Sequence, residues 1–164
     1  MVSIIIPMRN EQNFVAACLD SVLDQLREMP DAEVLCVDGA STDKTRAIVL
    51  DYADREPRVK LIDNYAQIVP VAMNLAIREA KGEVIIRLDC HAEYEKDYIK
   101  NCLATLERTG ADNVGGYIIT RAKSDSSIGK AIVAATSSRF GVGGSVFRTG
   151  GGEQEVDTVP FGCF

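Results

Sequence analysis

The sequence has no tryptophan, only one histidine and no excess of basic residues. Its 18 lysines and arginines are outnumbered by 24 aspartates and glutamates, which gives a formal net charge of −6. Because nucleic-acid backbones are bound by basic surfaces, this charge argues against a nucleic acid as the partner. An anionic ligand would therefore need local positive charge or a bound cation.

Long apolar runs and paired cysteines are also missing. No apolar run approaches the roughly 20 residues of a membrane helix, and no signal peptide precedes the first apolar segment, so we expect a soluble portion. The cysteines are odd in number, are scattered and form no C-x-x-C pair, which argues against a zinc site and favours reduced thiols in a cytosolic compartment. They are Cys18, Cys36, Cys90, Cys102 and Cys163.

The usual phosphate-binding loops are absent from the start of the chain. The first apolar segment is followed by Pro7-Met8-Arg9-Asn10-Glu11 and not by G-x-G-x-x-G or G-x-x-x-x-G-K-[ST]. This argues against dinucleotide oxidoreductases and P-loop enzymes, and also against sugar nucleotidyltransferases, which need a glycine-rich basic loop at this point. Without such a loop, a metal ion would have to hold any phosphate groups.

What the chain does contain is a regular alternation of short apolar runs and helical patterns. Its 164 residues are 46% hydrophobic, as expected for one globular domain with a core of its own. The apolar runs predict strands over residues 2–6 (halted by Pro7), 33–37, 59–62 and 83–88, and the helical spacing predicts helices over 14–26, 45–52 and 69–80. This order indicates an α/β fold with a mainly parallel sheet and helices on both faces.

The second half of the chain is less regular. The pattern predicts a helix over residues 94–108, a strand over 113–120 and a helix over 127–137. The glycines of 141–145 and 150–152 predict a mobile loop. The apolar ending at Phe164 leads us to expect that a longer natural protein continues beyond it.

Polar clusters follow three of the predicted strands, at Asn10-Glu11, Asp38–Asp43 and Asp89–His91. The carboxyl ends of parallel strands meet at one edge of the sheet, which is where such sheets bind ligands. Asp89 and His91 are two residues apart in extended chain, so their side chains point the same way. A carboxylate and an imidazole placed together can bind a divalent cation.

Each cluster also has a structural interpretation. Ser41 and Asp43 are suited to capping the following helix, and Asp89 could likewise be a cap with His91 on the surface. Asp38 is better placed for a ligand, because Gly39 lets a base or ribose approach the backbone. Arg87 either contacts a phosphate or pairs with a carboxylate inside the sheet.

Three segments together resemble the landmarks of family-2 glycosyltransferases. They are Val2–Glu11, Val37-Asp38-Gly39-Ala40-Ser41-Thr42-Asp43 and Leu88-Asp89-Cys90-His91, and their order and spacing match. The segment from Gly141 to Phe164 resembles the succinoglycan-type exopolysaccharide branch of that family. The resemblance covers essentially the whole chain.

The resemblance implies a GT-A-type, Rossmann-like nucleotide-sugar domain. In this interpretation the loop after the first strand borders the nucleotide, the second cluster contacts the uracil or ribose, and the third supports a metal and the diphosphate. The implied nucleotide-binding residues are Pro7, Arg9, Asn10, Glu11, Asp38, Gly39, Arg87 and Asp89, and the implied metal ligands are Asp89 and His91.

The third landmark departs from the family pattern. The usual motif is Asp-x-Asp, and this chain has His91 in place of the second aspartate. Imidazole suits Mn²⁺ better than Mg²⁺, so we expect Mn²⁺ to be preferred. The motif that supplies the general base in the family is absent up to Phe164, and the base is expected beyond it.

The expected activity is inverting transfer of a sugar from a nucleoside-diphosphate sugar, with UDP favoured, to a saccharide or lipid-linked acceptor in polysaccharide biosynthesis. We expect it at the cytoplasmic face of a membrane, reached only through the acceptor or a further C-terminal part. Residues 1–122 would be the donor-binding half and 123–164 the start of the acceptor side, within one domain. The alternative is a module that binds the nucleotide sugar without turnover.

Overall fold

The computed structural model describes residues 1–122, 125–150 and 152–164. The chain forms two compact units. The first contains Met1–Asn113 together with Phe161–Phe164, and the second contains Val114–Pro160. Each is described by itself below.

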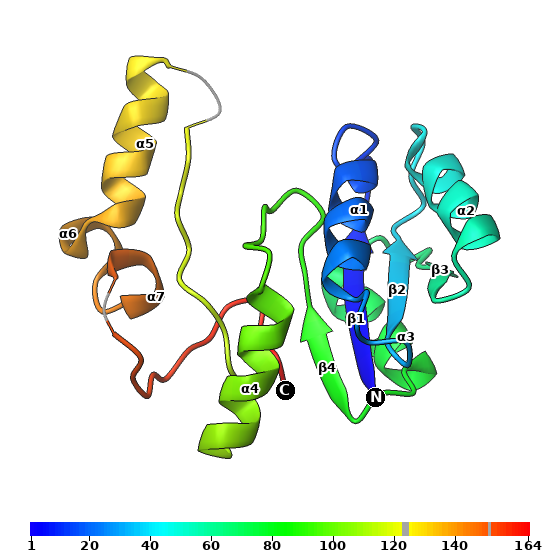
Figure 1. Cartoon of the computed structure of the whole chain (residues 1–164). Helices are drawn as coiled ribbons and strands as arrows, with labels where there is room; N and C mark the ends of the chain where they lie inside the picture. Colours follow the sequence, from blue (N-terminus) through cyan, green and yellow to red (C-terminus); the bar gives the residue numbers. More distant parts are fainter. Residues whose placement is uncertain (123–124, 151) are drawn as a thin grey trace. The chain divides into compact units, whose positions relative to one another are not determined.

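The first unit is built on a four-stranded parallel sheet with the order β3-β2-β1-β4 (Figure 1). The strands are β1 Val2–Met8, β2 Glu33–Asp38, β3 Val59–Asp63 and β4 Val84–Arg87. Every residue of β2 is buried, because β2 lies between two strands and is covered on both faces. The predicted parallel sheet is confirmed.

Helices cover both faces of this sheet, as predicted. They are α1 Val15–Gln25, α2 Thr45–Arg55, α3 Val69–Glu79 and α4 Tyr98–Thr109. On one face Ala72 and Ala76 of α3 pack against Ile5, Leu35 and Val37 of the strands. On the other face α1 contacts α2 and α4 (Figure 1).

Several predicted boundaries differ from the observed ones by a few residues, and two of these differences are informative. β1 does not stop at Pro7 but continues to Met8. The Ile5 carbonyl accepts a hydrogen bond from the Leu88 N–H, so the backbone groups of Ile5 point toward β4. The backbone of Pro7, two residues further on, points the same way. Because β4 has already ended there, Pro7 needs no N–H to donate. The helix predicted from residue 94 begins only at Tyr98.

The last residues of the chain extend the sheet at the outer edge of β4. Ile85 and Phe164 exchange two backbone hydrogen bonds of 2.7 and 2.9 Å, and the Arg87 N–H donates to the Gly162 carbonyl at 3.1 Å. This pairing is antiparallel, and it leaves Cys163 fully buried. Residues 161–164 therefore belong to the first unit although the second unit precedes them in the chain.

The described residues of the second unit form the helices α5 Ser127–Ser137, α6 Arg139–Val142 and α7 Val146–Thr149. The prediction for 127–137 is confirmed. The strand predicted over 113–120 is wrong, since Val114 alone forms a bridge and the Ile118 N–H bonds to the Phe147 carbonyl instead of a strand. The loop predicted around the glycines is also wrong where α6 and α7 form, and Gly151 lies outside the described residues.

Within the described parts of the chain, no helix combines the length and apolar character required to cross a bilayer.

Candidate functional site

The loops that follow β1 and β2 interlock at the carboxyl edge of the sheet. The Asn10 N–H donates to the Ser41 hydroxyl oxygen at 2.9 Å, and the Asn10 Oδ1 accepts from the Thr42 N–H at 2.8 Å. The Glu11 N–H donates to the Thr45 hydroxyl oxygen at 2.7 Å. Asn10 adopts a φ of 56°, which asparagine tolerates better than most residues. These bonds hold the two loops as one surface.

Asp38 is the last residue of β2 and organises the second loop. Its side chain is 2% exposed. The Ser41 hydroxyl donates to Oδ1 at 2.5 Å and the Ser41 N–H to Oδ2 at 3.2 Å, while Nη1 of Arg46 lies 3.9 Å from Oδ2. A buried carboxylate with these donors is fixed in position.

Asp43 helps to cap α2, which is the structural role considered for it from the sequence. Its Oδ1 accepts from the N–H and the hydroxyl of Thr45 at 2.9 and 2.5 Å, at the first turn of α2. Desolvation acts to raise the pKa of Asp43, but these bonds and the Gln12 N–H outweigh it and lower the pKa. Asp43 therefore stabilises the beginning of α2.

Gly39 marks a close approach between the first two loops. A Cβ atom at this position would lie 3.3 Å from both the Cβ of Arg9 and the carbonyl oxygen of Met8, to which the Gly39 N–H donates at 2.8 Å. Arg9 is exposed beside it, and Pro7 pairs with Val37 in the sheet. The predicted residues of β1 and β2 thus lie together.

A pocket of about 290 Å³ adjoins Asp38. Within it Asn64 is 2% exposed, donates through Nδ2 to the Ile68 carbonyl at 3.0 Å, and has a buried Oδ1 without a hydrogen-bond partner among the described residues. The Arg46 guanidinium forms an ion pair with Asp63, and Tyr65 is 80% exposed. The lining consists of Asp38, Ala40, Ser41, Arg46, Asp63, Asn64 and Tyr65.

Sequence reasoning missed Arg46, Asp63 and Tyr65. A signal was available for two of them, because Asp63 ends a parallel strand at the ligand edge and Tyr65 follows it. Arg46 lies in the first turn of α2, and only the tertiary structure shows that its side chain reaches across to β3.

A second cluster lies where the chain leaves β4. The Nε and Nη2 atoms of Arg87 are 3.3 and 3.1 Å from Oδ1 of Asp89, so Arg87 pairs with a carboxylate that follows the strand and not with one inside the sheet. The Asp89 N–H donates to the Tyr94 Oη at 2.7 Å, and burial raises the pKa of Tyr94. The described residues place no hydrogen-bond donor on Oδ2 of Asp89.

Asp89 and His91 form the corner that follows β4, and the His91 side chain reaches toward the loop after β1. Its Nδ1 lies 3.1 Å from Oε1 of Glu11, with the histidine side chain 61% exposed and that of Glu11 19% exposed. Glu11 therefore contacts the groups that follow both β2 and β4. Its N–H donates to the Thr45 hydroxyl oxygen and its carboxylate meets His91. Across residues 1–122, 125–150 and 152–164, no group of three or more His, Cys, Asp or Glu side chains is placed to hold a metal ion.

Cys90, which lies between Asp89 and His91 in the sequence, is buried. The hydrogen bond that it shares with the Cys18 thiol, together with its burial, raises the pKa of Cys90. A buried thiol of raised pKa is a poor nucleophile. All five cysteines are free and buried.

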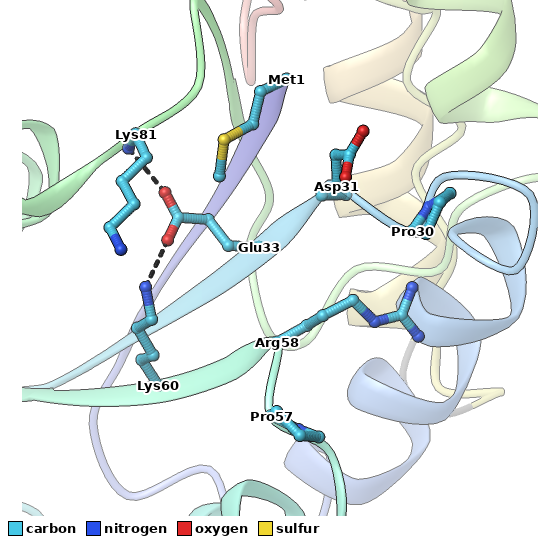
Figure 2. Close-up of a pocket in the computed structure, with 9 residues that line it drawn as sticks. Met1, Pro30, Asp31, Glu33, Pro57, Arg58, Lys60 and Lys81 are labelled. Atoms are coloured by element: carbon cyan, nitrogen blue, oxygen red, sulfur yellow. Dashed lines mark hydrogen bonds and ion pairs between the residues drawn. The ribbon is translucent and has the colours of Figure 1, made fainter.

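A larger hollow of about 490 Å³ lies by the amino ends of the strands (Figure 2). Glu33 is its central polar group and is 3% exposed. Its carboxylate accepts from the Lys60 Nζ at 2.6 Å, the Lys81 N–H at 2.6 Å and the Ser3 hydroxyl at 2.7 Å. Since these donors already occupy the carboxylate, the network ties β1, β2 and β3 together at the edge opposite the predicted site.

Comparison with known proteins places this architecture in a family. The sequence model of Glycosyl transferase family 2 matches residues 3–156. The succinoglycan biosynthesis protein ExoA of Rhizobium meliloti (strain 1021) is 36% identical over 149 residues, which are 90% of this chain and 44% of that protein. A dolichyl N-acetyl-alpha-D-glucosaminyl phosphate 3-beta-D-2,3-diacetamido-2,3-dideoxy-beta-D-glucuronosyltransferase of Methanococcus voltae is 32% identical over 124 residues, which are 71% and 39% of the two chains.

Solved structures agree with this result. The mannosyltransferase PcManGT from Pyrobaculum calidifontis, in complex with GDP-Man and Mn²⁺, has a TM-score of 0.65 at 28% identity and covers 73% of this chain and 35% of its own. The S. aureus TarS fragment 1-349 in complex with UDP-GlcNAc has a TM-score of 0.61 at 24% identity, covers 76% and 38% of the two chains, and shows the fold alone. The chain spans less than half the length of each of these proteins. Because the family model matches nearly the whole sequence and the parallel sheet matches the GT-A glycosyltransferases, this chain belongs to glycosyl transferase family 2.

Proposed function

We propose that this chain is the donor-binding part of a glycosyltransferase that moves a sugar from a nucleoside-diphosphate sugar to a saccharide or lipid-linked acceptor, with inversion, in polysaccharide biosynthesis. The observation that carries the proposal is the position of Glu11. Its N–H bonds to Thr45 at the beginning of α2 and its carboxylate meets His91, so it connects the groups that follow β2 and β4 along the ligand edge of the sheet.

The pocket beside Asp38 is suited to the nucleobase. Asn64 Oδ1 is a buried acceptor without a partner among the described residues, and the Arg46 guanidinium supplies N–H donors. Uracil presents one N–H between two carbonyl oxygens, which such a pair complements. The exposed ring of Tyr65 offers a stacking face. These features favour uracil, and equally thymine, over cytosine and guanine, and so favour UDP over CDP and GDP.

Asp89 and His91 are the residues that would hold a divalent metal. One carboxylate and one imidazole suit Mn²⁺ better than Mg²⁺, and Oδ2 of Asp89 and Nε2 of His91 accept no hydrogen bond from the described residues. Two protein donors leave the remaining ligand positions to water and diphosphate oxygens. Bound there, the metal would offset charge developing on the leaving diphosphate.

The remaining parts of the function lie with the rest of a longer protein. We place the acceptor side in residues 123–164 and beyond, and the general base outside this chain, because the relatives are more than twice as long as the region they share with it. We place the enzyme at the cytoplasmic face of a membrane, where a lipid-linked acceptor would be available. The chain by itself is then expected to bind the donor without turnover.

Thermal unfolding with UDP and Mn²⁺ tests the donor site. A ligand at 100 times its Kd stabilises the native state by about 2.7 kcal/mol, which raises the Tm of a domain of this size by about 5–10 °C. We expect this rise with wild type and with Glu95→Gln, a charge change at an exposed position in the same loop, and expect most of it to be lost in Asp89→Asn. No rise with UDP, GDP, CDP or dTDP plus metal would overturn the proposal.

A further inference from the structure

The side chain of Arg87 is held from two directions. On one side its Nε and Nη2 both reach Oδ1 of Asp89. On the other side its Cζ lies 5.4 Å from the centre of the Phe161 ring, within the range of a cation–π contact. The Arg87 guanidinium therefore has both a carboxylate and an aromatic ring as partners.

Phe161 is itself placed by an unusual backbone. Its φ is 51°, a conformation that is rare for a bulky residue and is kept only where the surroundings impose it. The Phe161 carbonyl accepts a hydrogen bond from the Tyr98 hydroxyl at 3.3 Å. Gly162, next in the chain, packs so closely on Asn113 that a Cβ atom there would lie 1.9 Å from the Asn113 Oδ1.

Arg87 bonds only one of the two carboxylate oxygens of Asp89. Both guanidinium nitrogens use the same oxygen, Oδ1, so the other oxygen is left without a donor from the described residues. A freely rotating guanidinium could instead bond both oxygens as a fork, and would then compete with a cation for Oδ2.

We propose that Phe161 is a positioning residue for the donor site. It holds Arg87 on Oδ1 of Asp89 and so keeps Oδ2 open for the metal–diphosphate group. The part played by Oδ2 rests on the proposed function, whereas the hold of Phe161 on Arg87 does not. The segment after the second unit would then act on the donor site without touching the donor.

Two measurements separate these claims. The first follows the Arg87 Nε–Hε signal by NMR without ligand, in wild type, Phe161→Leu, Phe161→Trp and Phe164→Leu. We expect Phe161→Leu to shift this signal and speed its exchange with water at least fivefold, because the ring is lost while an apolar side chain stays. Phe161→Trp, which keeps a π face, should restore slow exchange, and Phe164→Leu should leave the signal unchanged.

The second measurement is calorimetric titration of UDP in the presence of Mn²⁺ with the same four proteins. We expect a five- to tenfold weaker Kd in Phe161→Leu, near wild-type binding in Phe161→Trp and Phe164→Leu, and no further loss when Phe161→Leu is added to Asp89→Asn. An unchanged Arg87 signal in Phe161→Leu overturns the positioning claim whatever the titration gives. A changed signal with undiminished affinity overturns the link to Oδ2, and absence of binding by wild type overturns the proposed function alone.

Discussion

Replacing Asp38 with asparagine tests whether Asp38 contacts the nucleotide directly or only holds the loop after β2 in place. Asparagine keeps the shape of the side chain but removes its charge and turns one acceptor oxygen into a donor. In the structure Asp38 is 2% exposed, and its carboxylate accepts hydrogen bonds from the Ser41 hydroxyl at 2.5 Å and from the Ser41 N–H at 3.2 Å. The substitution therefore weakens both bonds at a buried position.

The expected magnitude follows from these contacts. A hydrogen bond to a charged partner is worth about 1 kcal/mol more than one to a neutral partner, and two such bonds are weakened. We add nothing for Arg46, which is 3.9 Å away and 44% exposed, because solvent screens that attraction. Asp38→Asn should thus lower the free energy of unfolding by about 2 kcal/mol and the Tm by about 4–8 °C.

The effect on the ligand should exceed what this loss of stability explains. If Asp38 also accepts a hydrogen bond from the base or ribose, UDP affinity falls at least tenfold, about 1.4 kcal/mol, under conditions where the variant is fully folded. The assays are urea unfolding and calorimetric titration of UDP with Mn²⁺. Asp43→Asn is the matched control, since it makes the same change at the beginning of α2 and should lower stability while leaving the Kd of UDP unchanged.

Two results would refute this reasoning. Unchanged UDP binding by Asp38→Asn, together with the expected loss of stability, would mean that Asp38 only organises its loop. Equal losses of affinity in Asp38→Asn and Asp43→Asn would mean that loop order decides binding and that no direct contact is needed.

Three further predictions concern the metal, pH and packing. His91→Asp restores two carboxylates at the corner, so the ratio of UDP affinities measured with Mn²⁺ and Mg²⁺ should shift at least threefold toward Mg²⁺, and an unchanged ratio would remove His91 from the ligand set. Burial acts to raise the pKa of Glu33, but Lys60 and the other donors lower it below its ordinary 4.5. Glu33 therefore stabilises the fold above pH 4.5, and this contribution is lost as the pH falls through the lowered pKa. Wild type should therefore lose more unfolding free energy than Glu33→Gln between pH 7 and pH 3; equal losses would contradict this. Gly82→Ala puts a Cβ 2.5 Å from the Ser3 backbone nitrogen and should cost about 1–3 kcal/mol in urea unfolding, whereas Gly144→Ala, with nothing within 4 Å, should be near neutral.

Local sequence patterns are sufficient to predict the order of strands and helices in the first unit. Apolar runs such as Glu33–Val37 and helical spacing such as that of 14–26 are local patterns, and local periodicity reports which face of an element is buried. Because parallel strands end at one edge, the alternation alone was enough to predict that Asp38, Asp89 and His91 lie at that edge.

In the second unit the same local patterns predicted only the helix over 127–137 correctly. Residues 113–120 have strand-like composition, but a strand needs a neighbour with free backbone groups, and Ile118 finds the Phe147 carbonyl instead. The glycines around Gly141 indicated a loop, yet short helices form there, with the Ser138 hydroxyl accepting from the Gly141 N–H. Propensity is a weak guide where tertiary contacts decide.

Which side chains meet within the site depends on how the elements pack in three dimensions. The bonds between Asn10 and Ser41, the pocket that joins Arg46 to Asn64, and the contact of Phe161 with Arg87 each connect residues from different elements. Such contacts depend on the three-dimensional path of the chain, and no spacing in the sequence encodes them. The residue types at the strand ends thus fixed what chemistry the edge could support, and packing decided how those groups are held.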